Sequence, residues 1–302
     1  MKEERKYGNR KFSVSNTDKM FFPKEKFTKG DLIDYYEKIA PVMLPYIRDR
    51  LITMVRFPDG IKGKQFYQKG APDYFPKWIK TKDIENRDGS TTDYVIANDQ
   101  ATLVYLANQA SVTPHIWLSR RDKPDKPDRL IIDIDPEVDD FTKVKDTAIK
   151  FRKILEDDLG LPTYIMTTGS RGLHITIPLK RQKSFDDVRA FAQNVADIME
   201  KQNPELVTTA ARKDKREKKI FLDVGRNAFG QTGVAPYAVR PIEGAPVATP
   251  VKWDELENLA SAREYNIKTI FERLEKDGDP WKDIDDHSVS LTKAEKKLKK
   301  LL

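Results

Sequence analysis

The stretch LIIDIDP (130–136) is the clearest strand signal in the chain. Because side chains alternate between the two faces of a strand, the apolar residues at its even positions point to one side, into an expected core. Asp133 and Asp135 then lie together on the other side. Two carboxylates on one face repel each other and resist desolvation, and a divalent cation would compensate them. A strand end whose acids face solvent or a lysine is the alternative, and this segment alone leaves it open.

A third acid stands in a similar position in IFLDVGRN (220–227), where Asp223 lies on the polar face of another predicted strand. Together with Asp133 and Asp135 it would give three carboxylates on adjacent strands. Such a set suits two Mg²⁺ or Mn²⁺ ions, which clamp the attacking and leaving oxygens in phosphoryl transfer. A single exposed strand acid is the alternative for Asp223.

The stretch TTGSRGLHITIPL predicts two strands joined by a tight turn, in which Gly169 and Gly172 flank Ser170 and Arg171. Backbone amides, a hydroxyl and a guanidinium in such a turn can bind phosphate oxygens. His174 emerges beside the turn on the second strand. An ordinary hairpin with a hydrogen-bonded histidine is the alternative. The chain has no GxxxxGK[ST] sequence, which argues against a P-loop nucleotidase.

Composition narrows the class of function. The 302 residues include 55 Lys and Arg against 48 Asp and Glu, a net charge of +7 that favours an anionic partner such as nucleic acid. The absence of cysteine excludes disulfides, thiolate metal sites and a thiol nucleophile, and only three histidines are present. Since no apolar run approaches the ~20 residues of a membrane helix and no signal peptide is recognisable, we expect a soluble, cytoplasmic protein without a membrane partner.

The remaining patterns predict helices and strands without strict βαβ alternation, so the expected fold class is α+β. The predicted helices are residues 30–44, 99–110, 140–159, 185–202, 253–259, 263–276 and 291–302. The predicted strands are residues 51–57, 93–98, 114–119, 130–135, 163–168, 173–179 and 220–224. Residues 120–129 and 226–250 are expected to be loops. For the Lys-rich tail, a frayed terminus is favoured over a docking helix.

The motifs occur in the order DxD, SRGxH and a single strand Asp. With SNTDKMFFP near the start and APYAVRPIEGAPVATPVKWDEL near the end, this order resembles the polymerase domain of DNA ligase D, in the archaeo-eukaryotic primase superfamily. The resemblance implies a primase-like core of mainly antiparallel sheets flanked by helices. It implies one primase-polymerase domain over residues 1–290, with a DNA-end-binding part (1–118), a catalytic part (119–290) and a basic tail (291–302).

The resemblance also implies roles for individual residues of the catalytic part. Asp133, Asp135 and Asp223 correspond to the catalytic metal ligands of the family. Many relatives have a lysine where this chain has Arg171, and the arginine preserves the positive charge. The residues that correspond to contacts with the incoming nucleotide and its triphosphate are Ser170, Arg171, His174, His115 and Arg240.

In the DNA-end-binding part, Asn16, Lys19 and Lys29 match the family's pocket for the 5′-phosphate of a downstream strand, and Phe66 and Tyr67 match aromatics that stack on bases. The residue types agree with these roles. Two lysines and an amide can bind a terminal phosphate through charge-assisted hydrogen bonds. Aromatic stacking contributes about 1–3 kcal/mol per base. The alternatives are solvated surface lysines and aromatics packed on the core at a strand edge.

We therefore expect a nucleotidyltransferase that adds ribo- or deoxyribonucleotides to a DNA 3′ end, for gap filling and end processing in non-homologous end joining. The resemblance implies two Mn²⁺ or Mg²⁺ ions and nucleoside triphosphate substrates. It implies DNA with gaps or double-strand-break ends, Ku and a separate ATP-dependent DNA ligase as partners, since this sequence has no KxDG adenylation motif. A primase-polymerase that starts strands, a non-catalytic DNA-end binding module and a nuclease remain alternatives.

Overall fold

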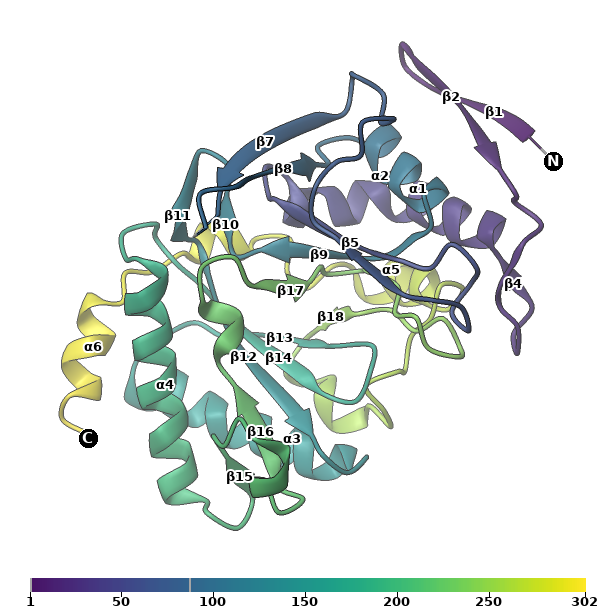
Figure 1. Cartoon of the computed structure of the whole chain (residues 1–302). Coiled ribbons are helices and arrows are strands. Elements are labelled where there is room, and N and C mark those ends of the chain that lie inside the picture. Colours follow the sequence, from purple (N-terminus) through teal and green to yellow (C-terminus); the bar gives the residue numbers. More distant parts are fainter. Residues whose placement is uncertain (1, 87) are drawn as a thin grey trace.

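Two six-stranded sheets form the core of the computed structural model, which describes residues 2–86 and 88–302 (Figure 1). The first, here called the acidic sheet, has the strand order β15 (Val207–Thr208), β16 (Ile220–Asp223), β12 (Arg129–Pro136), β14 (Leu173–Pro178), β13 (Tyr164–Thr167) and β18 (Thr249–Val251). The second, the amino-terminal sheet, has the order β17 (Thr232–Val234), β9 (Ser111–Trp117), β5 (Ile52–Arg56), β8 (Thr91–Ile96) and β7 (Lys80–Glu85), with β6 (Phe66–Gln68) paired to β5. The ladders between these strands are antiparallel, except for the parallel pair β15 and β16.

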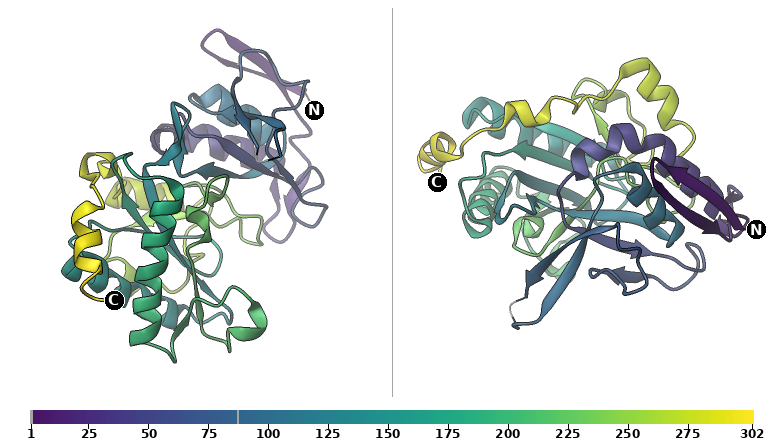
Figure 2. Two further views of the ribbon diagram at one scale, coloured as in Figure 1. Left: turned by 60° about the vertical axis from the view of Figure 1, so that its left-hand side comes forward. Right: turned by 90° about the horizontal axis from the view of Figure 1, so that it is seen from above.

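Helices and hairpins surround the two sheets. The α-helices of the described residues are α1 (Lys29–Ile47), α2 (Gln100–Asn108), α3 (Phe141–Lys153), α4 (Phe185–Gln202), α5 (Ile270–Asp277) and α6 (Thr292–Leu298), and a π-helical turn (Ile154–Asp158) continues α3. The hairpins are β1 (Lys2–Tyr7) with β2 (Arg10–Ser15), β3 (Met20–Phe22) with β4 (Phe27–Thr28), and β10 (Ser119–Arg120) with β11 (Lys123–Pro127). In both views of Figure 2, the β1–β2 hairpin and α6 lie at opposite ends of the molecule. No helix in the described ranges has the length and apolar character needed to cross a bilayer.

The alternation predicted for the acidic sheet is observed, and it divides the sheet into an apolar and a polar face. The apolar face packs on α3 and α4, with β12 in contact with both helices. Ser184 caps α4 in a reciprocal capping box with Asp187, and the Asp140 side chain caps α3. Each fully buried aliphatic side chain contributes about 1.5–3 kcal/mol, so this packing fixes which face β12 turns outward. Strand residues in this core are Leu130, Ile132, Ile134, Leu173, Ile175, Ile177, Ile220 and Leu222.

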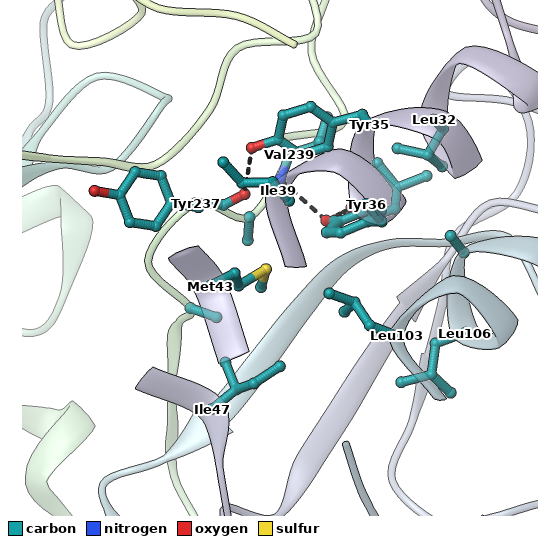
Figure 3. Close-up of a cluster of buried hydrophobic side chains, with 14 of the residues drawn as sticks. Leu32, Tyr35, Tyr36, Ile39, Met43, Ile47, Leu103, Leu106, Tyr237 and Val239 are labelled. Carbon is teal, nitrogen blue, oxygen red and sulfur yellow. Dashed lines mark hydrogen bonds between the residues drawn. The ribbon is translucent and has the colours of Figure 1, made fainter. Parts of the chain in front are cut away.

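Helix α1 positions the segment that leads to Arg240. The helix begins at Thr28, which forms a capping box with Asp31, and its apolar residues are buried at helical spacing. Figure 3 shows two of its tyrosines beside residues 237–239. The hydroxyl of Tyr35 donates to the carbonyl oxygen of Tyr237 at 2.7 Å, and the amide of Val239 donates to the hydroxyl of Tyr36 at 3.1 Å. These bonds hold the residue before Arg240 against the buried face of α1.

The polar face of the acidic sheet is turned toward the amino-terminal sheet. Met166 of β13 lies in the same hydrophobic cluster as Val234 of β17, so the two sheets meet there. Residues from the C-terminal part of the chain also join this cluster, among them Ile270 and Trp281. The predicted division at residues 118 and 119 and the boundary at residue 290 remain predictions.

Several element predictions are wrong in detail. Residues 226–250 were expected to be a loop but contain β17 and end with the first residues of β18, and residues 120–129 form much of the β10–β11 hairpin. These strands have two to five residues, too few for a pattern to emerge among Gly and Pro. The predicted helix 253–259 is a 3₁₀ turn at Leu256–Asn258, and the predicted helix 263–276 is reduced to α5.

The favoured prediction of a frayed tail is also wrong. Residues Thr292–Leu298 form α6, which contacts α4. Leu291, Ala294 and Leu298 are each at most 3% exposed and belong to the core beneath the acidic sheet. Their spacing of three and four residues places them on one helical face, so burial of that face explains why the tail is helical.

Candidate active site

The register of the acidic sheet places Asp133 between two polar partners. It stands directly opposite Asp223 in the β12–β16 ladder and directly opposite His174 in the β12–β14 ladder. Residues opposite each other in an antiparallel pair have Cβ atoms about 4.5–5.5 Å apart. Asp135 follows two residues along the same face, opposite Phe221. Antiparallel pairing therefore brings together carboxylates that are 88 and 90 residues apart in the sequence, as the numbers 135, 133 and 223 show.

The three carboxylates line a cavity of about 140 Å³ between the two sheets. The acidic sheet and the turn before β14 supply most of its wall, and the opposite wall comes from β9, β17 and the segment after Val239. The other lining residues are His115, Thr168, Ser170, Arg171, Gly172, His174, Arg226, Val234 and Arg240. The structure thus gathers every residue predicted for the metal and nucleotide sites into one cavity.

Burial and neighbouring charges shift the pKa values of two of these acids in opposite directions. Burial alone would raise the pKa of Asp133, but the His174 ring and the Arg226 guanidinium outweigh it and lower that pKa to about 2. For Asp135, burial and the adjacent charge of Asp133 raise the pKa above its ordinary value. Asp133 is therefore ionised throughout the neutral range, while Asp135 is protonated more readily than an ordinary aspartate.

Two arginines pair with the carboxylates. The Nε atom of Arg226 lies 3.4 Å from Asp133 Oδ2 and 3.8 Å from Asp223 Oδ2. The Nη2 atom of Arg171 lies 3.5 Å from Asp135 Oδ1. Arg226 was not predicted as a site residue, although it stands three residues after Asp223 in the quoted motif IFLDVGRN. This spacing of three residues from Asp223 was the one sequence feature that could have indicated a pairing between the two side chains.

The donor set fits hard divalent cations, because carboxylate oxygens are the ligands that Mg²⁺ and Mn²⁺ prefer. Among residues 2–86 and 88–302, no group of three or more Asp, Glu or His side chains is arranged to hold a metal ion. The guanidinium of Arg226 lies between Asp133 and Asp223 and balances their charge in this arrangement. Metal binding by the three aspartates remains a prediction.

The predicted turn before β14 is tight and lies against β12. The amide of Thr168 donates to the carbonyl oxygen of Gly172 at 3.0 Å, and Gly169 has φ +64°. A Cβ atom on Gly172 would lie 2.1 Å from the carbonyl oxygen of Ile134, so only glycine fits there. This close approach brings the turn against β12, where Ser170 and Arg171 line the cavity and Arg171 pairs with Asp135.

Two further arginines hold the turn. Arg240 donates from Nη1 to the carbonyl oxygen of Thr168 at 3.0 Å, and its buried Nε has no partner among the described residues. Arg263 donates from Nε to the carbonyl oxygen of Ser170 at 2.7 Å. Sequence analysis missed Arg263, because nothing distinguishes it from other charged residues of a predicted helix. The turn is therefore fixed from outside by guanidinium groups that can also meet an anion.

The two histidines of the cavity differ in their environment. Burial, followed by the charges of Arg240 and Arg226, lowers the pKa of His115 to about 3, so its imidazole is neutral at physiological pH. His174 Nε2 lies 3.4 Å from Asp133 Oδ1. The Nδ1 atom of His174 is buried and lacks a partner among the described residues. A buried unpartnered nitrogen is unfavourable unless a ligand or water completes it.

The residues predicted to bind a 5′-phosphate lie together at the start of α1. The backbone amide of Lys29 donates to the carbonyl oxygen of Lys19 at 2.8 Å, and Asn16 adopts a left-handed conformation at the preceding turn (φ 54°). The next two amides of the helix are also occupied, by the carbonyl oxygen of Thr17 at 2.8 Å and by the hydroxyl of Thr28 at 3.2 Å, so an anion here would be bound by side chains. The positive charge comes from the ammonium groups of Lys19 and Lys29, and Lys19 Nζ pairs with Asp59 at 2.6 Å.

Lys29 is held in place by a residue that sequence analysis missed. Its Nζ donates to Asn108 Oδ1 at 2.9 Å and to the carbonyl oxygen of Ser15 at 2.7 Å, and the residue is 5% exposed. Burial, followed by the charges of Lys19 and Arg56, lowers the pKa of Lys29 to about 8. Asn108 lies at the end of α2, far from Lys29 in sequence, so the pair required tertiary structure to be seen.

Phe66 and Tyr67 are both exposed on β6, at 44% and 68%. The alternative that they pack on the core is therefore wrong. Tyr67 lines a second groove of about 520 Å³ together with His115, Arg226 and Arg240, which also line the cavity of the aspartates. The cavity and the groove thus form one continuous surface from the carboxylates to an exposed aromatic.

Comparison with known proteins identifies the family. The family model described as the LigD primase-polymerase domain matches residues 28–281. The chain belongs to this family. The chain is also similar to the polymerase domain of Mycobacterium tuberculosis ligase D in complex with DNA, with a TM-score of 0.85 and 31% identity over 95% of this chain and 100% of that one. This likeness confirms the predicted α+β fold with its primase-like core.

Longer LigD proteins are similar to the chain over most of its length. It is 31% identical over 275 residues to the bifunctional non-homologous end joining protein LigD of Bacillus subtilis, covering 90% of this chain and 44% of that protein. It is 34% identical over 269 residues to the multifunctional LigD of Mycolicibacterium smegmatis, covering 88% of this chain and 35% of that protein. The chain therefore spans less than half the length of these relatives.

Proposed function

We propose that this chain is a DNA-dependent nucleotidyltransferase that adds ribo- or deoxyribonucleotides to a DNA 3′ end, and so fills gaps during non-homologous end joining. The observation that carries the proposal is the position of Asp133 directly opposite Asp223 in a cavity that also holds the turn at Ser170. Family membership supports it, because the LigD relatives are named for end joining and the M. tuberculosis polymerase domain was solved with DNA.

The proposed cofactors are two Mn²⁺ or Mg²⁺ ions, which Asp133, Asp135 and Asp223 would hold. When bound, such ions lower the pKa of the attacking 3′-hydroxyl and neutralise the charge on the leaving pyrophosphate. Asp133 is suited to this role because its low pKa keeps it ionised, and therefore able to ligate, at every pH near neutrality.

The cavity's other residues bind and orient the incoming nucleotide in this proposal. Ser170 and Arg171 bind the triphosphate through charge-assisted hydrogen bonds, and the free Nε of Arg240 adds a donor, since it has no partner among the described residues. His115 stays neutral, so it contributes a directional hydrogen bond without adding charge. His174 holds Asp133 with one ring nitrogen and presents the other to a ligand.

The DNA-end-binding part positions the gapped DNA relative to the cavity of the aspartates. The side chains of Asn16, Lys19 and Lys29 bind the 5′-phosphate on the far side of a gap, beside the start of α1. Phe66 and Tyr67 present exposed faces on which unpaired bases stack. The distance between the phosphate site and the aspartates would determine the length of the gap that the enzyme fills.

The partners that we propose beyond DNA and nucleoside triphosphates are a Ku-type end-binding protein and an ATP-dependent DNA ligase. A filled gap still carries a nick, and sealing it requires a ligase activity. We propose that these proteins act together at chromosomal ends in the cytoplasm.

A labelled primer in a duplex with a short gap tests the proposed function. With Mn²⁺ or Mg²⁺ and NTPs or dNTPs, we expect the primer to lengthen by the size of the gap, and more efficiently when the downstream strand carries a 5′-phosphate. A primer that shortens would indicate a nuclease, and one that is bound but unchanged would indicate a binding module. Products formed on a template without primer would favour the primase alternative.

A further inference from the structure

Arg226 lies where a divalent cation would be expected to act. Its Nε is 3.4 Å from an oxygen of Asp133 and 3.8 Å from an oxygen of Asp223, the pair that stands face to face in the β12–β16 ladder. Two carboxylates so placed repel each other, and one guanidinium between them removes most of that repulsion. The pKa of Arg226 is affected first by burial, which lowers it, but Asp133 and Asp223 outweigh burial and raise it above the ordinary value.

The backbone that carries Arg226 is anchored on both sides. The side chain of Asn227 is fully buried and pairs with β12, accepting from the amide of Ile131 at 2.9 Å and donating to its carbonyl oxygen at 2.7 Å. The amide of Gly225 donates to Asp223 Oδ1 at 2.8 Å, and a Cβ atom on Gly225 would lie 2.9 Å from that oxygen. These bonds tie the backbone on either side of Arg226 to β12 and to Asp223.

The side chain of Arg226 borders a second space besides the cavity of the aspartates. Arg226 lines both the cavity of the aspartates and the adjoining 520 Å³ groove that leads to Tyr67. It is 38% exposed, whereas Asp133 is nearly buried. A rotation of the guanidinium toward the groove would release the two carboxylates and would place a positive charge where a nucleotide or a DNA strand passes.

We propose that Arg226 is a positioning residue that serves as an internal counter-ion: it competes with divalent cations for Asp133 and Asp223, and it turns toward the anionic substrate in the groove when a cation takes its place. This inference rests on the proposed function in one respect, that the aspartates bind a cation. Because a phosphate in the groove offers the displaced guanidinium a new partner, cation and nucleotide binding strengthen each other.

Mn²⁺ binding to the nucleotide-free protein tests this proposal directly. Free Mn²⁺ is measured by electron paramagnetic resonance for the wild type, Arg226→Gln and Arg226→Lys. We expect Arg226→Gln to bind Mn²⁺ about tenfold more tightly, which corresponds to about 1.4 kcal/mol. Arg226→Lys keeps a competing charge and should stay within about threefold of the wild type.

Arg152→Gln is the matched control for the general loss of a positive charge. Arg152 lies on α3, on the apolar side of the acidic sheet, and pairs with Glu156 at 2.8 Å, whereas Arg226 pairs directly with two of the aspartates. We expect the effect of Arg152→Gln on Mn²⁺ affinity to be less than about threefold, because charge effects across the sheet are screened more than direct pairing. An equal gain in both Gln variants would overturn the counter-ion role.

Thermal unfolding separates this role from a structural one. In EDTA, Arg226→Gln should unfold below the wild type, since the carboxylates repel each other unopposed; in saturating Mn²⁺ the difference should vanish or reverse. Equal destabilisation in both conditions would contradict the proposal. If both proteins bind Mn²⁺ with the same affinity, the counter-ion role falls and the proposed function stands; if neither binds Mn²⁺, both fall.

Discussion

Asp133 and Asp223 face each other across one antiparallel ladder, although 90 positions separate them in the sequence. The pairing explains the arrangement of charge around them: His174 approaches Asp133 from the opposite ladder, and Arg226 reaches both carboxylates from the turn after β16. The acidic sheet thus concentrates negative charge on its polar face, where nitrogen donors pair with it. This is the feature on which the proposed chemistry depends.

The buried position of Lys29 predicts a pH dependence of 5′-phosphate recognition. The pKa of Lys29 is lowered to about 8 by burial and by Lys19, so the free protein loses this positive charge as pH rises through that value. The preference for 5′-phosphorylated over 5′-hydroxyl gapped DNA should therefore fall above pH 8, by at most about tenfold per pH unit for one proton. Fluorescence anisotropy with both DNAs from pH 6.5 to 9.5 measures it.

The variant Lys29→Gln is the control for that titration. It should have little 5′-phosphate preference at any pH, and its affinity for 5′-hydroxyl DNA should match that of the wild type. The same pKa shift affects folding with the opposite sign: between about pH 8 and 10.4 the unfolded chain binds more protons at Lys29, so this residue makes stability rise with pH. A 5′-phosphate preference that is flat across pH 8 would contradict the account of Lys29.

Asn108 should tune the charge of Lys29. In the wild type, Lys29 Nζ lies 2.9 Å from the amide oxygen of Asn108. The substitution Asn108→Asp keeps an oxygen at this position but adds a negative charge. That charge should raise the pKa of Lys29 and move the fall in 5′-phosphate preference to a higher pH. It should also weaken phosphate binding at pH 7, because the new carboxylate offsets the positive charge of the protonated lysine and repels the phosphate. An unchanged pH midpoint in the anisotropy titration would show that Asn108 does not control Lys29.

Arg263 should matter for nucleotide binding more than for chemistry. Its guanidinium holds the carbonyl oxygen of Ser170 at 2.7 Å, so Arg263→Gln loosens the turn that we propose binds the triphosphate. Hydrogen bonds to charged groups contribute about 1.5–3 kcal/mol, and partial exposure reduces this, so we expect KM for the nucleotide to rise about tenfold. kcat should stay within about twofold, and Arg263→Lys should restore part of KM. A fall in kcat at constant KM in steady-state incorporation would contradict this role.

Gly172 should tolerate no side chain. A Cβ atom there would lie 2.1 Å from the carbonyl oxygen of Ile134, in the middle of the acidic sheet. Overpacking of this kind costs about 1–3 kcal/mol or more, so Gly172→Ala should lower the free energy of unfolding measured in urea. Gly230→Ala is the matched control: Gly230 has φ +79°, but a Cβ atom there would meet no atom of the described residues within 4 Å, so only backbone strain of about 1 kcal/mol applies. Equal losses would show that the contact with Ile134 is unimportant.

Sequence analysis predicted which residues lie on each face of β12, β14 and β16, because a strand has a period of two residues. Once the apolar residues are assigned to the core, the alternate residues must lie on the opposite face. It could not derive which residues stand opposite each other, since the register of Asp133 with Asp223 and His174 depends on pairing across long connections. The resemblance to a family supplied the grouping that the pattern alone left open.

The residues that were missed share a physical reason. Asn108 and Arg263 act through hydrogen bonds to residues 79 and 93 positions away, and no local pattern records such partners. Arg226 also pairs with Asp133, 93 positions away, and its local pairing with Asp223 does not reveal that partner. Short strands such as β17 were missed because three residues among glycines carry too little periodicity. The tail was underestimated because its buried face is small and becomes visible only once α4 is in place.

Single-turnover incorporation of one nucleotide into a gapped duplex tests the central claim most directly. It compares the wild type with Asp223→Asn, which is nearly isosteric and removes one carboxylate from the set, and DNA affinity is measured on the same samples. We expect incorporation by the variant to fall by at least about a thousandfold, a barrier increase of about 4 kcal/mol, while DNA binding stays within about threefold. Incorporation at the wild-type rate by Asp223→Asn would contradict the assignment of these aspartates to phosphoryl transfer.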